Sequence, residues 1–158
     1  MLRAHAYDEL DTSLGVISFA VDRAGRLKRL DFGRATAPCS PTLPELRRFS
    51  DQLAEYFAGS RTAFDIELAP DGTPFQLEVW RALSLIPFGR TASYAEIARR
   101  VGKPGAARAV GQANGANPIP IVIPCHRVIA ADGTLGGFSS GLGIKRKLLA
   151  LEQISLAA

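Results

Sequence analysis

The 158-residue sequence contains few of the residues that build metal sites and covalent frameworks, with only two cysteines and two histidines. Cys39 and Cys125 lie 86 residues apart and no Cys-x-x-Cys pair occurs. This spacing argues against both a disulfide framework and a zinc cluster. With His5 and His126 as the only histidines, we expect no metal and no other cofactor.

Long hydrophobic runs are also missing. No stretch approaches the roughly 20 uninterrupted apolar residues that a membrane span requires, and residues 2–9 lack the apolar core of a signal peptide. We therefore expect a cytoplasmic protein without membrane contact. The chain has 47% apolar and 22% charged residues, which is typical of globular domains, and its length suffices for one ordinary core or two small ones.

Charge is unevenly distributed along the chain. The net charge is only +4, but residues 1–70 hold nine Lys/Arg against ten Asp/Glu, whereas residues 71–158 hold ten against five. Neutralisation of phosphates by basic side chains supplies most non-specific affinity for nucleic acids. The second half therefore has the charge of a surface that meets a polyanion, although many basic domains bind no nucleic acid.

Two short β-like runs begin the first half of the chain. Residues 14–21 and 26–32 flank a turn in which Gly25 can take a positive φ, and this pattern indicates a hairpin. Residues 62–68 alternate between apolar and polar side chains and predict a further strand. We therefore expect a small antiparallel sheet in this half.

A helix and a domain boundary follow from the remaining pattern. Apolar residues recur at helical spacing between Pro44, near the start, and Gly59, just past the end. The cluster 69–74 contains proline, glycine and aspartate and breaks regular structure. The sequence thus predicts two domains, residues 1–70 and residues 75–158.

The second domain is expected to be mainly helical. An apolar stripe over 75–86 predicts one helix and places Trp80 in the core. The run 93–96 fits a Ser-x-x-Glu capping box, which predicts a helix over 94–101. A glycine-containing turn leads to another short helix over 106–114, and the pair suggests a helix-turn-helix.

The helix over 106–114 has an unusual composition for a DNA reader. It is built largely from small residues, with Arg108 as its only charge, so it offers few long polar side chains to base edges. Small side chains let a backbone approach the minor groove, and an arginine among them could fill the space left by a displaced base. The alternative is an Ala-rich helix packed tightly against its neighbours, with Arg108 at the surface.

Cys125 stands beside His126 at the end of the apolar run 118–124. The β-branched residues of that run are stiff and readily buried, so we expect the cysteine to be held firmly. A rigid cysteine needs a neighbouring base or cation to become a nucleophilic thiolate, and His126 and Arg127 can both supply that. The alternative is that Cys125 is only a buried small hydrophobe.

The carboxyl-terminal segment 142–156 combines apolar residues with the basic triplet Lys145, Arg146 and Lys147. Such triplets are mostly the solvated face of a core helix, and we expect the same here. Spacing alone does not distinguish Glu152 from a surface residue.

Several of these segments match one known family, in order and at the right distances. They are Ser93-Tyr94, Ala106-Ala107-Arg108-Ala109-Val110-Gly111, Gly115-Ala116-Asn117-Pro118 and Ile123-Pro124-Cys125-His126-Arg127-Val128. Together they closely resemble the O6-alkylguanine-DNA alkyltransferases, over nearly all of 75–152, whereas residues 1–70 match only in layout. The resemblance implies an α/β amino-terminal domain with a small antiparallel sheet, similar to ribonuclease H. It further implies a mainly α-helical carboxyl-terminal domain that contains a helix-turn-helix, binds DNA and accepts the alkyl group.

The resemblance implies DNA repair by direct reversal. Such a protein flips O6-alkylguanine, and also O4-alkylthymine, out of the duplex and transfers the alkyl group irreversibly to its own cysteine, here Cys125. His126 would be the base, acting through a water, and Glu152 would orient and charge the imidazole. This is the nucleophile, base and orienter logic of a hydrolase triad applied to an sp³ carbon. Because the thioether is stable, one protein molecule would serve one lesion.

Further roles are implied by the same resemblance. Asn117 resembles the family asparagine that pins the active-site turn, and Tyr94 the tyrosine whose hydroxyl protonates the departing guanine. Arg108 resembles the finger that replaces the flipped nucleotide. The small residues that would lie with it against DNA are Ala106, Ala107 and Gly111.

The run 135–141 resembles the substrate loop of the family. Its glycines permit close backbone approach, and backbone N–H groups near Ser139 could hydrogen-bond the guanine O6. The loop residues concerned are Gly136, Gly137, Phe138 and Ser139. Phe138 stands where many members have tyrosine, and Ser140 where glycine or a bulky residue is frequent, so Tyr94 gains weight as the proton donor.

The implied partner is double-stranded DNA that carries O6-alkylguanine, contacted from the minor groove by a monomer that can assemble cooperatively on DNA. The main alternative is an alkyltransferase-like protein that binds lesions without repairing them, but such relatives lack the acceptor thiol. An unrelated cysteine hydrolase or a DNA-binding regulator is a third possibility. A hydrolase would turn over many times, and a regulator would more often be a dimer with a polar recognition helix.

Overall fold

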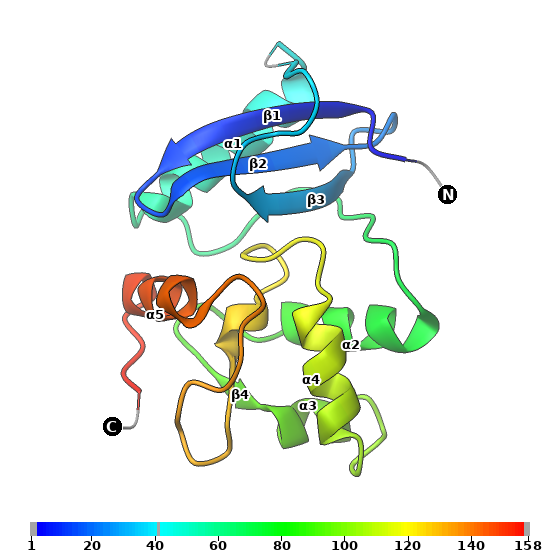
Figure 1. Cartoon of the computed structure of the whole chain (residues 1–158), viewed down its shortest axis with the longest axis vertical. Coiled ribbons are helices and arrows are strands. Elements are labelled where there is room, and N and C mark those ends of the chain that lie inside the picture. The colour runs from blue at the N-terminus through cyan, green and yellow to red at the C-terminus, as the bar shows by residue number, and fades with distance from the viewer. Residues whose placement is uncertain (1–2, 41, 157–158) are drawn as a thin grey trace. The chain divides into compact units, whose positions relative to one another are not determined.

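Three antiparallel strands open the chain, which we describe from a computed structural model over residues 3–40 and 42–156 (Figure 1). The strands β1 (Ala6–Thr12), β2 (Gly15–Val21) and β3 (Leu27–Phe32) pair in the order β1-β2-β3. The predicted hairpin corresponds to β2 and β3, and Gly25 in its turn has a φ of +79°. The strand β1 was not predicted: it is an acidic strand at the edge of the sheet, and most of its residues are only half-buried.

The helix α1 (Pro44–Phe57) lies along the sheet and closes the first core (Figure 1). Its apolar stripe is buried, and Phe49 meets Phe19 of β2 edge to face with ring centroids 4.9 Å apart. Proline in the first turn and Gly59, at a φ of +80°, mark its two ends. The helix predicted between Pro44 and Gly59 is therefore confirmed.

The strand predicted over 62–68 is wrong. Only Leu68 bridges to Leu27, and the rest of the segment has no strand partner among the described residues. The side chain of Gln52 replaces a partner strand: its Nε2 donates to the carbonyl oxygen of Asp65 at 3.0 Å and its Oε1 accepts from the Asp65 N–H at 2.8 Å. Because these backbone groups are already satisfied, no ladder is needed there.

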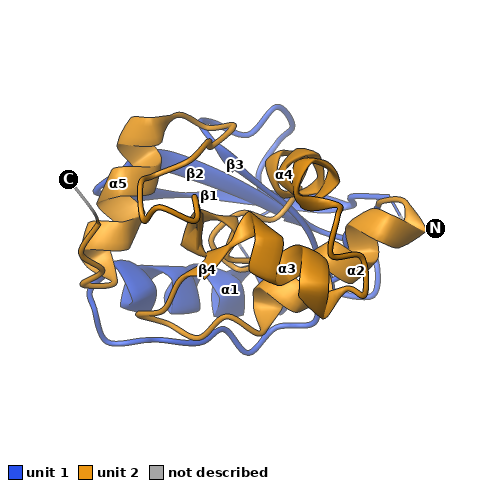
Figure 2. Cartoon of the chain, turned by 90° about the horizontal axis from the view of Figure 1, so that it is seen from below, with its two compact units in different colours: residues 1–71 blue, residues 72–158 orange. Residues whose placement is uncertain are grey.

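The chain divides into two compact units, Met1–Asp71 and Gly72–Ala158, coloured separately in Figure 2. The second unit contains four of the five helices seen among the described residues. They are α2 (Pro74–Ser84), α3 (Tyr94–Arg100), α4 (Ala107–Gly115) and α5 (Leu142–Leu151). The protein is thus a mixed α/β chain with a small antiparallel sheet.

The helices predicted over 75–86, 94–101 and 106–114 correspond to α2, α3 and α4, each beginning within one residue of its predicted start. Ser93 and Glu96 form the expected capping box of α3, and Thr73 forms a second one with Gln76 at the start of α2. Trp80 is buried, as expected, and its indole N–H donates to the Ala113 carbonyl oxygen at 2.9 Å. This bond ties α2 to α4.

A short parallel pair, β4 (Ala92–Ser93) and β5 (Val128–Ile129), was not foreseen. The two strands have two residues each, too few for a periodic signal in sequence. Their pairing brings the start of α3 next to the segment that follows Cys125. This small sheet positions the candidate site.

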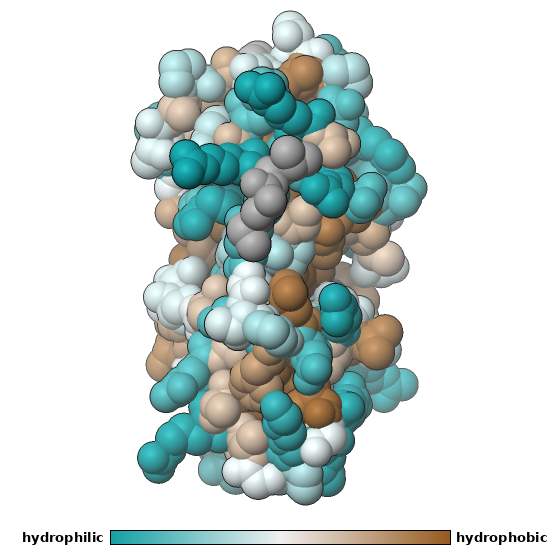
Figure 3. Space-filling view, turned by 90° about the vertical axis from the view of Figure 1, so that its right-hand side faces the viewer, coloured by the Kyte–Doolittle hydropathy of each residue, from teal (hydrophilic) through white to brown (hydrophobic). Residues whose placement is uncertain are grey.

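The surface has no extended apolar face on the side drawn in Figure 3, where hydrophilic side chains separate small hydrophobic patches. Within the part of the chain that the structure describes, no helix is long and apolar enough to cross a membrane.

Candidate active site

Cys125 opens a single 3-10 turn, η1 (Cys125–Arg127), and its side chain is buried. The apolar run before it forms tight turns rather than a strand, with Ile119 and Ile123 fully enclosed. Within this run Ile121 has a φ of +74°, a conformation that costs a β-branched residue on the order of 1–3 kcal/mol. The surrounding structure must therefore enforce the shape of the turn.

Two asparagines enforce it. The Oδ1 of Asn117 accepts from the Ile119 N–H at 2.9 Å, and its Nδ2 donates to the Ile123 carbonyl oxygen at 2.8 Å. Asn114, in the last turn of α4, donates from its buried Nδ2 to the Cys125 carbonyl oxygen at 3.3 Å. Asn114 was missed from sequence, although a polar residue on the apolar face of a helix, four positions from Val110, was a signal.

His126 is fully buried and pairs with Glu152, whose Oε2 lies 2.6 Å from its Nε2. A carboxylate only accepts hydrogen bonds, so Nε2 carries the ring proton and Nδ1 is the basic nitrogen. Nδ1 is buried and has no hydrogen-bond partner among the described residues. Burial lowers the pKa of His126 below its ordinary value, although Glu152 opposes this by favouring the imidazolium.

Arg127 does not act as a cation beside the thiol, contrary to one of the two options read from the sequence. Its Nε donates to Glu152 Oε1 at 2.7 Å, one terminal nitrogen donates to Oε2 at 3.1 Å, and the other to the Ile86 carbonyl oxygen at 2.7 Å. Its charge is therefore balanced by Glu152 in the buried pair. That Arg127 stands two positions after Cys125 in the sequence gave no indication that its side chain turns toward Glu152.

Burial raises the pKa of the Cys125 thiol to about 11, while a hydrogen bond from Asn117 and the charge of Lys145 act in the opposite direction. The resting side chain is thus a thiol near neutral pH. A nucleophilic sulfur requires that the proton be removed as the reaction proceeds.

The prediction that the basic triplet is a solvated face is wrong for Lys145. Arg146 and Lys147 are exposed, but Lys145 is fully buried. Its position three and four residues before the buried Leu148 and Leu149 places it on the same helix face. That spacing is the signal that sequence reasoning could have used.

Tyr94, at the start of α3, meets the loop that follows β5. Its hydroxyl oxygen accepts from the Gly137 N–H at 3.3 Å. Gly136 has a φ of +69°, and a Cβ there would lie 2.8 Å from the same oxygen. Phe138 is half-buried and Ser139 is exposed.

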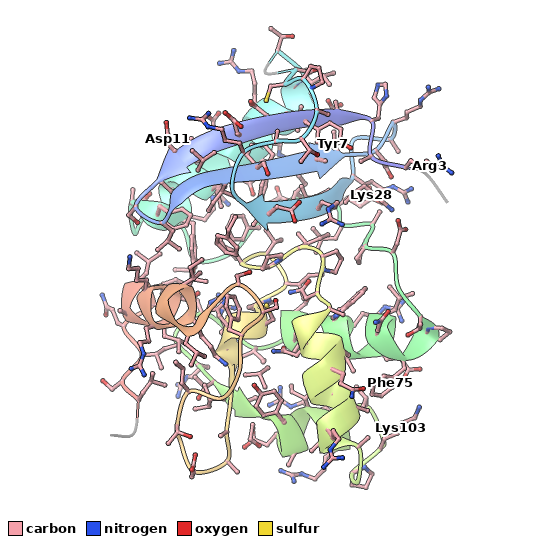
Figure 4. All side chains as sticks on the ribbon, viewed as in Figure 1. Arg3, Tyr7, Asp11, Lys28, Phe75 and Lys103 are labelled. Atoms are coloured by element: carbon pink, nitrogen blue, oxygen red, sulfur yellow. The ribbon has the colours of Figure 1, made fainter. Side chains whose placement is uncertain are left out.

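The helix α4 approaches the same tyrosine through Gly111, where a Cβ would be 3.8 Å from the Tyr94 ring. Arg108 is exposed on this helix, and Ala106 and Ala107 are half-buried. Lys103, in the turn before α4, stacks over the Phe75 ring with its ammonium 4.9 Å from the centroid (Figure 4). Exposed cations also end α3, at Arg99 and Arg100.

Among the described residues no group of three or more His, Cys, Asp or Glu side chains could hold a metal ion. The second cysteine, Cys39, is exposed in the first unit.

Known proteins are similar to this chain in sequence and in fold. The family model "6-O-methylguanine DNA methyltransferase, DNA binding domain" matches residues 74–154. The chain is 48% identical over 156 residues to the methylated-DNA--protein-cysteine methyltransferase of Methanosarcina barkeri, covering 95% of this chain and 98% of that one. It is 62% identical over 103 residues to the protein of the same name from Mycolicibacterium paratuberculosis, covering 65% of this chain and 62% of the relative.

A solved structure agrees along most of the chain. The crystal structure of Mycobacterium tuberculosis OGT in complex with DNA superposes with a TM-score of 0.84 at 46% identity, covering 94% of this chain and 93% of that one. A family model thus matches more than half of the residues, and a relative of nearly the same length is almost half identical. This chain belongs to the methylated-DNA--protein-cysteine methyltransferase family.

Proposed function

We propose that the protein repairs alkylated DNA by direct reversal, moving the alkyl group of O6-alkylguanine, and of O4-alkylthymine, onto Cys125. The observation that carries this proposal is the buried thiol at the end of an asparagine-held turn, directly beside the His126–Glu152 pair. Family membership supports the same chemistry, because the relatives are named for methyl transfer from DNA to a protein cysteine.

The reaction begins with removal of the thiol proton. His126 Nδ1 is the free basic nitrogen, and it takes the proton from Cys125 through a water molecule, while Glu152 stabilises the imidazolium that forms. The lowered pKa of His126 keeps the ring neutral at rest, ready to accept. Arg127 in turn fixes both oxygens of Glu152.

The sulfur then attacks the sp³ carbon of the lesion. The C–S bond forms as the C–O6 bond breaks, and the electron pair of the broken bond passes to the purine. Tyr94 supplies the proton that neutralises the departing guanine. Because Phe138 has no hydroxyl, Tyr94 is the aromatic residue of this loop region that can donate it. The thioether is stable, so each molecule acts once.

The guanine would be held by the loop over 136–139, where backbone N–H groups near Ser139 can bond its O6. Two features favour this role. The φ of Gly136 requires glycine, and the Gly137 N–H already meets Tyr94. The loop therefore lies beside the proposed proton donor.

Binding to DNA is assigned to the pair α3 and α4, acting as a helix-turn-helix. The small residues Ala106, Ala107 and Gly111 allow α4 to approach the minor groove, and Arg108 fills the place of the flipped nucleotide. The exposed position of Arg108 and the neighbouring exposed cations support this assignment. We infer a cytoplasmic monomer that can assemble cooperatively along DNA.

In this proposal residues 75–158 form the DNA-binding and alkyl-acceptor domain, and residues 1–70 form a ribonuclease-H-like α/β domain. The sheet of three strands covered by one helix supports the second assignment only in layout. The alternative of a lesion-binding protein without repair activity is disfavoured, since Cys125 is present within a specifically bonded turn.

The decisive experiment weighs the intact protein after incubation with a duplex that contains O6-methylguanine. The proposal expects the mass of one methyl group gained per molecule, and no gain in Cys125→Ser. Restoration of guanine without a gain in protein mass would overturn it, and binding without restoration would identify a lesion-binding protein.

A further inference from the structure

Lys145 is a fully buried cation whose two hydrogen-bond acceptors are both main-chain carbonyls. Its Nζ donates to the Val128 carbonyl oxygen at 2.7 Å and to the Gly137 carbonyl oxygen at 2.9 Å. Lysine is almost never fully buried unless paired, because removing an ammonium from water is costly. Because burial of this ammonium is costly, we looked for a role of Lys145 in the contacts that it makes.

The two carbonyls belong to different parts of the candidate site. Val128 begins β5 immediately after the turn that carries Cys125, and Gly137 lies in the proposed substrate loop. Gly137 also donates its N–H to the Tyr94 hydroxyl at 3.3 Å. One peptide segment of the loop is therefore held from two sides, by Tyr94 and by Lys145.

The charge of Lys145 also acts on the sulfur. Arg127, the cation nearest to Cys125 in sequence, is committed to Glu152 and to the Ile86 carbonyl. Lys145 is the basic side chain whose charge lowers the pKa of the Cys125 thiol, and Cys125 in turn raises the pKa of Lys145. The interaction is therefore mutual.

We propose that Lys145, rather than Arg127, is the cation of the alkyl-acceptor site: a positioning residue whose buried ammonium holds the Gly137 loop against β5 and favours the charged form of the Cys125 sulfur. This inference rests on the proposed alkyl transfer. Lys145 neither gives nor takes the proton in this scheme. The proton leaves sulfur for His126, and the ammonium lowers the energy of the anion that remains.

The other ionisable group that faces this ammonium is His126, whose imidazolium form Lys145 disfavours. Burial lowers the pKa of Lys145 to about 8, against the effect of Cys125. The amine is therefore mostly protonated at neutral pH and loses its charge in the mildly alkaline range. Lys145 is therefore charged at the neutral pH at which alkyl transfer is proposed to take place.

The test compares Lys145→Met with Lys147→Met, which removes the same charge from the exposed side of the same helix. Both are made in a Cys39→Ala background, so that Cys125 is the only thiol, and their folding is checked by circular dichroism. Methyl transfer from an O6-methylguanine duplex is timed from neutral to mildly alkaline pH. An adjacent opposite charge shifts a pKa by about 1–3 units.

We expect methyl transfer by Lys145→Met to be about tenfold slower or more at neutral pH, where the parent amine is charged and stabilises the anion that forms as His126 takes the proton. The difference between the two proteins should narrow as the pH rises through about 8, where the parent amine loses its charge. Lys147→Met should match the parent protein. An unchanged rate in folded Lys145→Met, or a deficit that does not depend on pH, would overturn the inference. Failure of the parent protein itself to gain a methyl group would instead refute the proposed function.

A second measurement decides the matter if Lys145→Met does not fold. The rate of methyl transfer by the parent protein is followed across the pH range in which the Lys145 amine, observed by NMR, loses its proton. The inference expects the rate to fall as the amine loses its charge. A rate that stays level or rises through that range would overturn it.

Discussion

Replacing Glu152 by glutamine tests the centre of the proposed mechanism, because this carboxylate serves two buried groups at once. It accepts from His126 Nε2 at 2.6 Å and from Arg127 at 2.7 and 3.1 Å. Glutamine keeps one acceptor oxygen, but its NH₂ would face a donor and the guanidinium would lose its counter-charge. Breaking a buried ion pair on one side costs about 3–5 kcal/mol, and the retained acceptor places this variant near the lower figure.

The expected loss of about 3 kcal/mol corresponds to a melting temperature lower by roughly 10 °C for a chain of this size. The rate of alkyl transfer should also fall, since a neutral amide can present either its oxygen or its NH₂ to His126, and it cannot stabilise the imidazolium by charge. We expect at least about a hundredfold slower transfer, in the direction known for orienting carboxylates of catalytic triads.

The assay is single-turnover methyl transfer followed by intact mass, at a temperature well below the melting point of the variant. Glu78→Gln, on the exposed side of α2, is the matched control and should match the parent protein. A stable Glu152→Gln with transfer within twofold of the parent rate would refute the role of Glu152 in both stability and catalysis.

Three further predictions follow from the same site. Gly136→Ala should abolish most methyl transfer and lower the free energy of unfolding by about 1–3 kcal/mol, because the φ at this position is +69° and the new Cβ would lie 2.8 Å from the Tyr94 hydroxyl oxygen. Gly137→Ala has open space around its Cβ and should have a milder effect in the same assay. The pKa of His126 in the folded protein lies below its ordinary value of 6.5, so the unfolded chain binds more protons as pH falls. Urea denaturation should therefore show that the contribution of His126 to stability is complete above about pH 6.5 and declines at lower pH. His126→Gln should weaken that decline, and an equal pH dependence of stability in both proteins would contradict the assignment. Arg108→Ala should slow repair of a duplex far more than reaction with free O6-methylguanine, which needs no flipping, and equal losses on both substrates would argue against the finger role.

The local elements of this protein could be read from its sequence because each carries its own signal. The capping box at Ser93, the helix between Pro44 and Gly59 and the turn at Gly25 depend on residues a few positions apart. The same holds for the segment from Asn117 to His126, in which the turn and the nucleophile are adjacent in the chain. Neighbouring residues suffice for such features, since backbone geometry restricts what they can form.

Features that depend on distant partners required the tertiary structure. The segment 62–68 has the alternation of a strand, but Gln52 satisfies its backbone at Asp65. β4 and β5 have only two residues each, so their pairing is decided by the packing around them.

The electrostatics of the site were likewise decided by folding. The sequence alone determined that a thiol, a histidine and an arginine are neighbours in the chain, and that the thiol lies on a stiff segment. Only the tertiary structure decided that Arg127 turns to Glu152 while Lys145, twenty positions after Cys125, is buried against the loop and acts on the sulfur. The physical reason is that charge interactions and burial depend on distance in space, which sequence separation does not measure.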